Sequence, residues 1–141
     1  MGNIEEFYKN TKNALPHENV KEFISLNIKS GKAIDLGCGA GRDSIFLIKN
    51  NWNVTSIDLK NTQSFITEKL STKELKRFRF IQTSFENLNL EKNNLVVANY
   101  SLPFCKKVFF PILWNKINSS IQKNRLFCWE FFWRKRFLEK Y

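Results

Sequence analysis

Histidine and cysteine are both scarce in this sequence of 141 residues, which argues against several kinds of site. His17 is the one histidine, and the three cysteines, Cys38, Cys105 and Cys128, lie far apart with no C-x-x-C pair. Such a set gives no support to a structural zinc site, and an odd number of scattered cysteines does not form a disulfide framework. We therefore expect no metal site and a reducing compartment, the cytoplasm.

Long apolar runs are missing as well. No stretch approaches the roughly 20 apolar residues that a membrane span requires. The N-terminus, M-G-N-I-E-E-F-Y, has neither the basic start nor the apolar core of a secretory signal. We expect no membrane partner, and a length of 141 residues favours one domain with a single sizeable core.

Acidic residues are the minority charge, with 13 Asp and Glu against 23 Lys and Arg, for a net charge of +10. Such a balance can indicate a nucleic-acid partner. However, the lysines are scattered singly, and no arginine-rich stripe or aromatic recognition motif appears before residue 125. The charge therefore favours a solvated basic face, with RNA binding as the alternative.

What the sequence does contain is a glycine-rich stretch, Ala33–Asp43, which reads A-I-D-L-G-C-G-A-G-R-D. A short apolar run is followed at once by Gly37, Gly39 and Gly41, and then by an amphipathic segment. A buried strand that turns through glycines into a helix lets backbone N–H groups approach a ligand. The spacing G-x-G-x-G differs from the G-x-G-x-x-G of dinucleotide folds. Asp35, two residues before the first glycine, would repel a diphosphate and suit an ammonium group.

A second acid, Asp58, ends the next predicted strand, Asn53–Asp58. It lies about 20 residues after the first glycine, where dinucleotide folds place an acid that binds ribose hydroxyls. The same geometry serves any adenosine that lies across the strand ends. Asp58 is therefore predicted to bind a ribose.

The glycine stretch resembles motif I of the class I S-adenosylmethionine-dependent methyltransferases, D-x-G-x-G-x-G. Together with Asp58, the segment N-Y-S-L-P-F-C that begins at Asn99 and the segment L-W-N-K-I that begins at Leu113, it resembles a bacterial subgroup near the tellurite-resistance methyltransferases. The resemblance runs from about Phe7 to Asn124. It implies transfer of the methyl group of S-adenosylmethionine to a small-molecule acceptor. Because that chemistry mainly requires alignment of the acceptor with the sulfonium carbon, no catalytic residue is assigned.

The same resemblance implies roles for particular residues. Asp35 and the glycine loop would hold the methionine part of the cofactor, Asp58 the ribose, and Ser84 with Phe85 the adenine. Ser84 departs from the acid that the family often has there, and Phe85 is equally a candidate for the core. Cys38 is expected to be a small residue of the loop rather than a nucleophile. The full predicted cofactor-binding set is Asp35, Gly37, Cys38, Gly39, Gly41, Asp58, Leu59, Ser84, Phe85 and Asn99.

The acceptor is expected beside the loop after the fourth strand. Tyr100 and Ser101 of this loop, with Tyr8 of the N-terminal helix, are the predicted acceptor contacts. Phe7-Tyr8 and Asn10-Thr11 match the start of the subgroup, which implies that this helix covers the cofactor and excludes water. The loop lacks the N-P-P-Y pattern of enzymes that methylate base amino groups, which counts against such a substrate.

The predicted fold is α/β, a Rossmann-like, doubly wound, mostly parallel sheet in the order 3-2-1-4-5, without the last two of the family's seven strands. Residues 1–124 are expected to form the cofactor-binding domain, with a helical lid over about 1–30. The expected strands are 33–36, 53–58, 78–83, 94–98 and 126–133. The expected helices are 4–12, 18–29, one after the first strand with Ile45, Phe46 and Ile48 inward, 62–76 with a break near 71–72, and 112–121.

Residues 125–141 do not resemble the family and form a basic, aromatic tail, expected to be strand five and a short helix. With permitted codons, reading this segment one base later gives G-Y-F-V-G-N-F-F-G-E-K-D-S-W-R-K-Y, which resembles the family's continuation. We hypothesise a one-base insertion near codon 125, which sequencing of the gene tests. A truncated sheet would leave an exposed edge with Phe127, Trp129, Phe131 and Trp133, and could self-associate.

Three other functions stay open at this point, and one of them is an RNA methyltransferase. A truncated chain could be an inactive remnant that at most binds the cofactor. The strand-to-helix turn could also belong to a nicotinamide-binding module.

Overall fold

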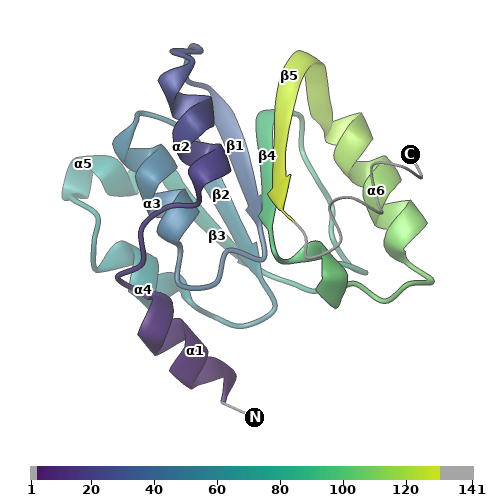
Figure 1. Ribbon diagram of the computed structural model, residues 1–141, viewed down its shortest axis with the longest axis horizontal. Helices are drawn as coiled ribbons and strands as arrows, with labels where there is room; N and C mark the ends of the chain where they lie inside the picture. Colours follow the sequence, from purple (N-terminus) through teal and green to yellow (C-terminus); the bar gives the residue numbers. More distant parts are fainter. Residues whose placement is uncertain (1–2, 131–141) are drawn as a thin grey trace.

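The computed structural model describes residues 3–130. They form a five-stranded parallel sheet in the order β3-β2-β1-β4-β5 (Figure 1), so the predicted order 3-2-1-4-5 is confirmed. The strands are β1 (Lys32–Leu36), β2 (Asn53–Asp58), β3 (Phe78–Gln82), β4 (Asn93–Asn99) and β5 (Ile121–Glu130).

In the described part of the chain, two α-helices precede the first strand, and four α-helices and one short 3₁₀ helix lie between successive strands. They are α1 (Ile4–Thr11), α2 (Glu18–Ser25), α3 (Arg42–Lys49), α4 (Gln63–Thr67), α5 (Thr72–Leu75), η1 (Leu102–Phe104) and α6 (Phe110–Ser120). Within residues 3–130, none is both long and apolar enough to cross a lipid bilayer.

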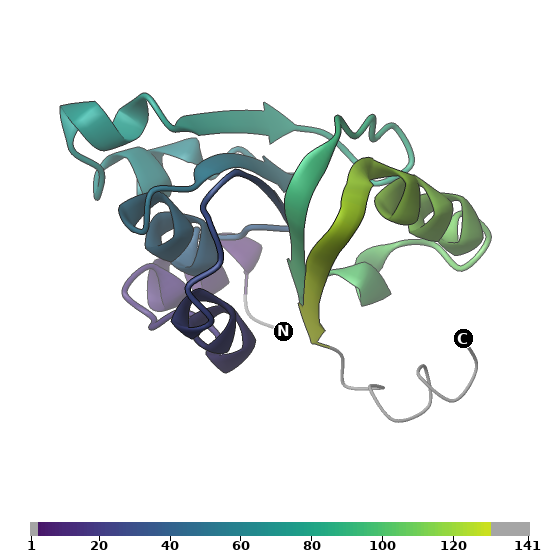
Figure 2. The same cartoon turned by 90° about the horizontal axis from the view of Figure 1, so that it is seen from above.

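Helices α2 and α3 cover one face of the sheet (Figure 2). Phe23 of α2, Leu47 of α3 and Trp52 pack there against the strand residues Val54 and Leu95. All five side chains are buried, and the Phe23 and Trp52 rings lie 5.4 Å apart. This cluster forms one of the two hydrophobic cores on either side of the sheet.

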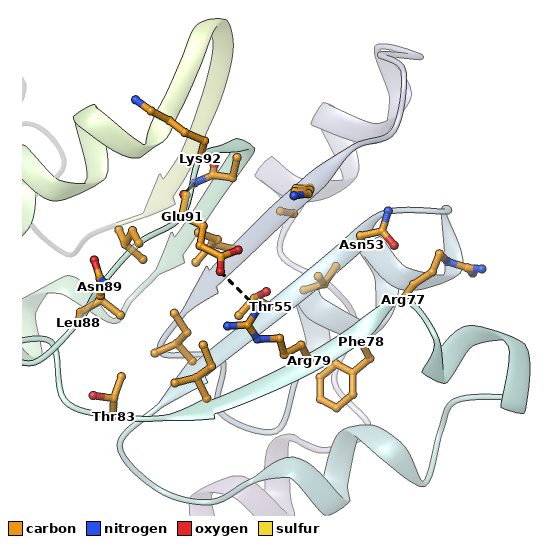
Figure 3. Close-up of a pocket in the computed structure, with 18 of the residues that line it drawn as sticks. Asn53, Thr55, Arg77, Phe78, Arg79, Thr83, Leu88, Asn89, Glu91 and Lys92 are labelled. Carbon is orange, nitrogen blue, oxygen red and sulfur yellow. Dashed lines mark hydrogen bonds and ion pairs between the residues drawn. The ribbon is translucent and has the colours of Figure 1, made fainter.

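Helix α6 lies on the other face, beside β4 and β5 (Figure 2), and buries Leu113 and Ile117. The connection from β3 to β4, residues 83–92, contains no helix. Part of this face is therefore left as a groove of about 470 Å³, lined largely by β2, β3 and this connection. Figure 3 shows Arg79 of β3 and Glu91 reaching toward each other across it, with their charged groups 3.5 Å apart.

Two helices end earlier than expected. Helix α2 ends at Ser25 because Asn27 takes the left-handed backbone conformation (φ 54°) that commonly terminates helices. The expected helix 62–76 is interrupted, as predicted, and forms α4 and α5. A capping box begins α5, since the Ser71 hydroxyl accepts a hydrogen bond from the Glu74 N–H and the Glu74 carboxylate accepts one from the Ser71 N–H.

Helix α3 turns polar side chains inward at its start. Of the three apolar residues expected to face inward, Ile48 is fully buried, whereas Ile45 and Phe46 are half-buried. The buried residues of the helix are Asp43, Ser44, Leu47 and Ile48. This difference matters because Asp43 and Ser44 point toward the ends of the strands.

Strand β5 begins at Ile121, before the expected start at residue 126, and pairs with β4 as far as Glu130 beside Asn99. It is the edge of the sheet within the described residues. The last residues of the expected strand five, including Phe131 and Trp133, and the expected terminal helix lie outside the residues that the structure describes.

Candidate functional site

The carboxyl ends of β1, β2 and β4 meet at one edge of the sheet, with α1 close by (Figure 1). Strand β1 lies between β2 and β4, so the strand order reverses there, and such switch points form ligand crevices in open α/β sheets. Asp35 lies near the end of β1, and Asp58 and Asn99 are the last residues of β2 and β4. We call this region, with the glycine loop Gly37–Gly41, the carboxyl-edge site.

Two glycines of the loop make room for the protein's own side chains. A Cβ atom on Gly37 would lie 2.3 Å from the Cβ of Ser101, and one on Gly41 would lie 2.3 Å from the Cγ1 of Ile66. Both residues also have positive φ, 69° and 86°, where a side chain is strained. Gly37 and Gly41 therefore serve packing, a role that the spacing of the motif did not predict.

Gly39 is different, because it faces the N-terminal helix. A Cβ there would lie 3.5 Å from the nearest atom, in the Tyr8 ring, which is ordinary van der Waals contact. Its φ of 55° still favours glycine. Of the three glycines, Gly39 thus has the loop surface that a ligand could reach if Tyr8 moved.

Asp58 connects the end of β2 to the glycine loop. Its Oδ2 accepts a hydrogen bond from the Gly39 N–H at 2.9 Å. Its Oδ1 accepts one from the Lys60 N–H at 3.0 Å and one from the Tyr8 hydroxyl at 3.2 Å. A ligand hydroxyl offers the same donor as Tyr8, so it would compete with Tyr8 for Oδ1.

Tyr8 holds helix α1 against the glycine loop. Burial raises the pKa of the Tyr8 phenol, and the charge of Asp58 adds to this effect, so the phenol stays protonated and donates. The N-terminal helix therefore lies at the glycine loop, where the resemblance implied a lid. Tyr8, predicted to contact the acceptor, instead contacts Asp58, the predicted ribose ligand.

Asp35 is enclosed between β1 and α3. Its Oδ2 accepts a hydrogen bond of 2.6 Å from the Ser44 hydroxyl, which also lies 2.6 Å from the Ser56 hydroxyl. Burial raises the pKa of Asp35 to about 8, and the negative charge of Asp43 acts in the same direction. A carboxyl group with this pKa is mostly protonated at pH 7, and a cation placed beside it would favour ionisation.

Asp43 forms a second cluster, which was not predicted as a site. Its Oδ1 accepts the backbone N–H of His17 at 2.8 Å, and its Oδ2 lies 2.7 Å from the His17 Nδ1. Asn99 donates to the same Oδ2 at 2.9 Å and exchanges amide hydrogen bonds with Asn19. Burial alone would raise the pKa of Asp43. The hydrogen bonds and charge of His17, together with the hydrogen bond from Asn99, outweigh this effect and lower the pKa.

Cys38 is buried inside the glycine loop, with its Sγ 3.8 Å from the Thr62 hydroxyl. Burial raises the pKa of the thiol well above its usual range, and the charges of Asp35 and Asp58 add to this. A thiol that is hard to ionise is a poor nucleophile, in agreement with the expectation of a small loop residue.

The predicted adenine contacts lie beside Asp58. The Thr83 N–H donates to the Asp58 carbonyl oxygen at 3.0 Å, which brings the next residue, Ser84, to the end of β2. Leu59 is 63% exposed there and offers an apolar surface. Phe85 packs against the core under α6, which favours the core role that the sequence left open.

Of the two residues in the loop after β4 that were predicted to contact the methyl acceptor, one is exposed. Tyr100 is 39% exposed and has left-handed backbone (φ 59°). Ser101 is buried beneath Gly37, and its hydroxyl donates to the Leu36 carbonyl at 2.6 Å. Ser101 therefore stabilises the end of β1, and Tyr100 is the residue of the pair that an acceptor could reach.

The arrangement as a whole suits a ligand with hydroxyl groups and positive charge. Asp58 provides carboxylate oxygens that accept hydrogen bonds, and Asp35 and Asp43 place further acids beside the loop. Such oxygens favour hydroxyl, ammonium and sulfonium groups and disfavour phosphates.

A family model described as Tellurite resistance protein TehB matches residues 2–128 of the chain. A curated relative, carboxy-S-adenosyl-L-methionine synthase from Nautilia profundicola, is 30% identical over 125 residues, which make up 86% of this chain and 51% of the relative. The chain thus spans about half the length of that relative.

Solved structures agree on the fold. TehB from Haemophilus influenzae superposes with a TM-score of 0.70 at 24% identity, over 86% of this chain and 42% of that chain. The glycopeptide N-methyltransferase MtfA, solved with S-adenosylmethionine, gives a TM-score of 0.65 at 16% identity, over 82% of this chain and 56% of that one. These findings confirm the resemblance that the motifs indicated and the cofactor that it implied for the family.

Proposed function

The chain belongs to the tellurite resistance protein TehB family, a family of S-adenosylmethionine-dependent methyltransferases, and on that premise we propose that it transfers the cofactor's methyl group to a small-molecule acceptor. S-adenosylmethionine supplies a methyl group on a positively charged sulfur, which is an electrophile for any acceptor lone pair. The protein's part is to bind, align and exclude water.

The contact between Asp58 and Gly39 carries this proposal. A carboxylate at the end of β2 that is already hydrogen-bonded to the glycine loop is positioned to accept both hydroxyls of a ribose. Tyr8 currently donates to this carboxylate, and in the proposal a ribose hydroxyl replaces it. Leu59 and Ser84, beside Asp58, would then border the adenine.

The other half of the site fits the charged end of the cofactor. Asp35 and Asp43 are buried acids close to the glycine loop, and ammonium and sulfonium groups are cations. The pKa of Asp35, raised to about 8, would fall again when a cation binds next to it. Cofactor binding would therefore release a proton in part of the molecules at neutral pH.

Calorimetric titration with S-adenosylhomocysteine tests the cofactor site, and titration with NAD tests the nicotinamide-binding alternative. We expect S-adenosylhomocysteine to bind and NAD not to bind. Asp58→Ala should weaken binding by at least about 100-fold, because two hydrogen bonds to a charged acceptor contribute about 1.5–3 kcal/mol each. The matched control Glu68→Ala removes an exposed acid outside the site and should leave the affinity unchanged.

Binding of NAD in preference to S-adenosylhomocysteine would contradict the proposal. A methyl-transfer assay with radiolabelled S-adenosylmethionine then separates an enzyme from a remnant that binds cofactor without turnover. The titration and the assay together test the binding step and the chemical step independently.

A further inference from the structure

The start of α2 places the chain's one histidine between the glycine loop and the loop after β4. His17 is the residue before α2, and the Asp43 carboxylate holds it twice, through its backbone N–H and through Nδ1. Asn99, the last residue of β4, donates to the same carboxylate at 2.9 Å. The His17 ring lies 5.4 Å from the ring of Tyr100, the exposed residue on the predicted acceptor side.

Capping of α2 explains only half of this contact. The Asp43 Oδ1 accepts the His17 N–H, which already satisfies a backbone donor at the start of the helix. The His17 side chain itself caps nothing, although the residue before a helix usually provides a side-chain cap. The second bond, from the ring to Oδ2, therefore orients the imidazole for something other than the helix.

The bond between the ring and Oδ2 fixes which nitrogen carries the proton. An ionised carboxylate only accepts hydrogen bonds, so Nδ1 donates and Nε2 of the neutral ring keeps its lone pair. Nε2 faces away from the carboxylate that holds Nδ1. The side chain is 18% exposed, and no further hydrogen bond to the ring occurs among residues 3–130.

We propose that His17 is the general base of the methyl transfer proposed above and that Asp43 is its positioning residue. The inference rests on the proposed function, and it adds that the acceptor is a protic nucleophile such as a thiol or selenol. The acceptor lone pair forms the bond to the methyl carbon, the methyl–sulfur bond breaks, and its electron pair stays on the sulfur. The acceptor's proton goes to Nε2, where the charge of Asp43 stabilises the imidazolium that forms.

The groups around the ring are consistent with this role. Asp43 is the charged group in contact with it, and the Arg42 guanidinium donates to the Leu15 carbonyl, two residues before His17, at 2.6 Å. The neighbouring groups from all packed elements are Asp43 and Arg42 of α3, Asn99 and Tyr100 from β4 and its loop, and Glu18 and Asn19 of α2. Of these groups, the Asp43 carboxylate is the charge that touches the imidazole, at 2.7 Å from Nδ1.

Because the sequence contains a single histidine, ¹⁵N NMR of the imidazole reads this site directly. We expect the neutral ring to be the Nδ1–H tautomer in the wild-type chain and to become a mixture in Asp43→Asn. A neutral ring in the Nε2–H form would overturn the proposal, since that nitrogen could not accept a proton.

Kinetics with two probes at pH 7 provide the second test. With 2-mercaptoethanol as a protic acceptor, His17→Gln should lower kcat by about 100-fold. With dimethyl selenide, which has no proton to lose, its rate should stay within about twofold of the wild-type rate. Glu18→Gln, an exposed neighbour, is the matched control and should leave both rates unchanged.

Titration with S-adenosylhomocysteine separates the failure of this inference from that of the proposed function. If the wild type does not bind it, the proposed function fails. If His17→Gln binds it normally and methylates the thiol at the wild-type rate, only the base role is overturned. A parallel loss of S-adenosylhomocysteine affinity and of both rates would instead make His17 a cofactor contact.

Discussion

Two regions of the sheet differ in a way that bears on where a ligand binds. The groove on the α6 face is hollow, with a volume of about 470 Å³, whereas the carboxyl-edge site is filled by the protein's own side chains, including Tyr8 and His17. The groove is lined by basic residues, namely Lys32, Lys76, Arg77, Arg79 and Lys92, with Glu91 as the one acid among its lining residues. The carboxyl-edge site instead buries Asp35, Asp43 and Asp58.

The groove exists because the β3–β4 connection forms no helix that would cover this part of the sheet. Its volume is therefore explained by the fold and is no evidence of a binding site. At the carboxyl-edge site, the carboxyl groups already accept hydrogen bonds from donors of the protein itself. In the proposed function, the hydroxyl groups of a ligand would replace those donors. A ligand that binds there has to displace those donors, so its affinity is the difference between ligand contacts and internal contacts.

The largest contrast concerns one pair of polar side chains in each region. Asp43 is buried and its partner His17 is mostly covered, whereas Arg79 and Glu91 are both more than half exposed. We expect Asp43→Ala to lower the free energy of unfolding by about 3–5 kcal/mol, because it leaves the donors of His17 and Asn99 without their acceptor. Urea denaturation at pH 7 measures it.

The pH dependence of this loss of stability tests its cause. The pKa of Asp43 is lowered in the folded chain, so its stabilisation is present above the ordinary carboxyl pKa and is lost as the pH falls below it. The difference between Asp43→Ala and the wild type should therefore shrink in acid. A difference that grows in acid would show that the pair is not what stabilises the site.

The glycines provide the next contrast, within the site itself. Gly41→Ala should destabilise by about 2–5 kcal/mol, because strain at positive φ adds to a clash with Ile66. Gly39→Ala should cost only about 1–2 kcal/mol, since its Cβ would meet Tyr8 at 3.5 Å. Thermal unfolding ranks the two variants.

A double-mutant cycle checks the cause of the larger loss. In an Ile66→Ala background, Gly41→Ala should cost less than in the wild type, because the clashing Cγ1 atom is gone. Equal costs in both backgrounds would mean that backbone strain alone decides the order.

If Tyr8 competes with the cofactor for Asp58, removing its hydroxyl should increase the affinity for the cofactor. Tyr8→Phe removes the hydroxyl that donates to Asp58 and keeps the ring against Gly39. Binding of S-adenosylhomocysteine should tighten by about tenfold or more, the value of one hydrogen bond to a charged group. Weaker binding in calorimetry would show that the hydroxyl contacts the ligand rather than competing with it.

Asp35 gives a subtler effect, on the pH dependence of stability. Because its pKa is raised to about 8, Asp35 keeps its proton in the folded state at pH values where the unfolded state has lost it. Asp35 therefore lowers the free energy of unfolding more and more as the pH rises from the ordinary carboxyl pKa to about 8. Asp35→Asn cannot ionise, so its Tm relative to the wild type should rise from pH 5 to pH 8. A constant difference over that range would contradict the raised pKa.

The smallest effect belongs to the groove. Glu91→Gln removes the charge of an exposed pair whose partner atoms are 3.5 Å apart, and such pairs contribute about 0–1 kcal/mol. Urea denaturation should barely separate this variant from the wild type, and S-adenosylhomocysteine affinity should not change. A marked loss of affinity would place the ligand in the groove.

Local patterns predicted the sheet and its loop well. The strand Asn53–Asp58 has the predicted bounds, and Asp58 and the glycine loop meet as expected, because strand patterns and glycine turns are local signals. The contacts between distant segments were not predictable in this way. Nothing in the spacing shows that Gly37 faces Ser101, or that Asp43 binds a histidine 26 positions away.

The sequence nonetheless contained a signal for the contact between His17 and Asp43. His17 follows Pro16 at the start of a predicted helix, and Asp43 follows the glycine loop at the start of another. Helix starts that pack at the same edge of a sheet bring such residues together, but only the fold decides which pair meets. The groove was also missed, because it follows from a helix that the β3–β4 connection does not form.

Backbone amide NMR mapping with S-adenosylhomocysteine tests the central claim most directly, because it compares the two regions in one titration. We predict shifts concentrated at the carboxyl-edge site, at Gly39, Asp58 and Leu59, with Thr55 and Arg79 of the groove unaffected. Shifts concentrated on the groove residues, with Gly39 and Asp58 unchanged, would contradict the assignment of the cofactor site to the carboxyl edge of the sheet.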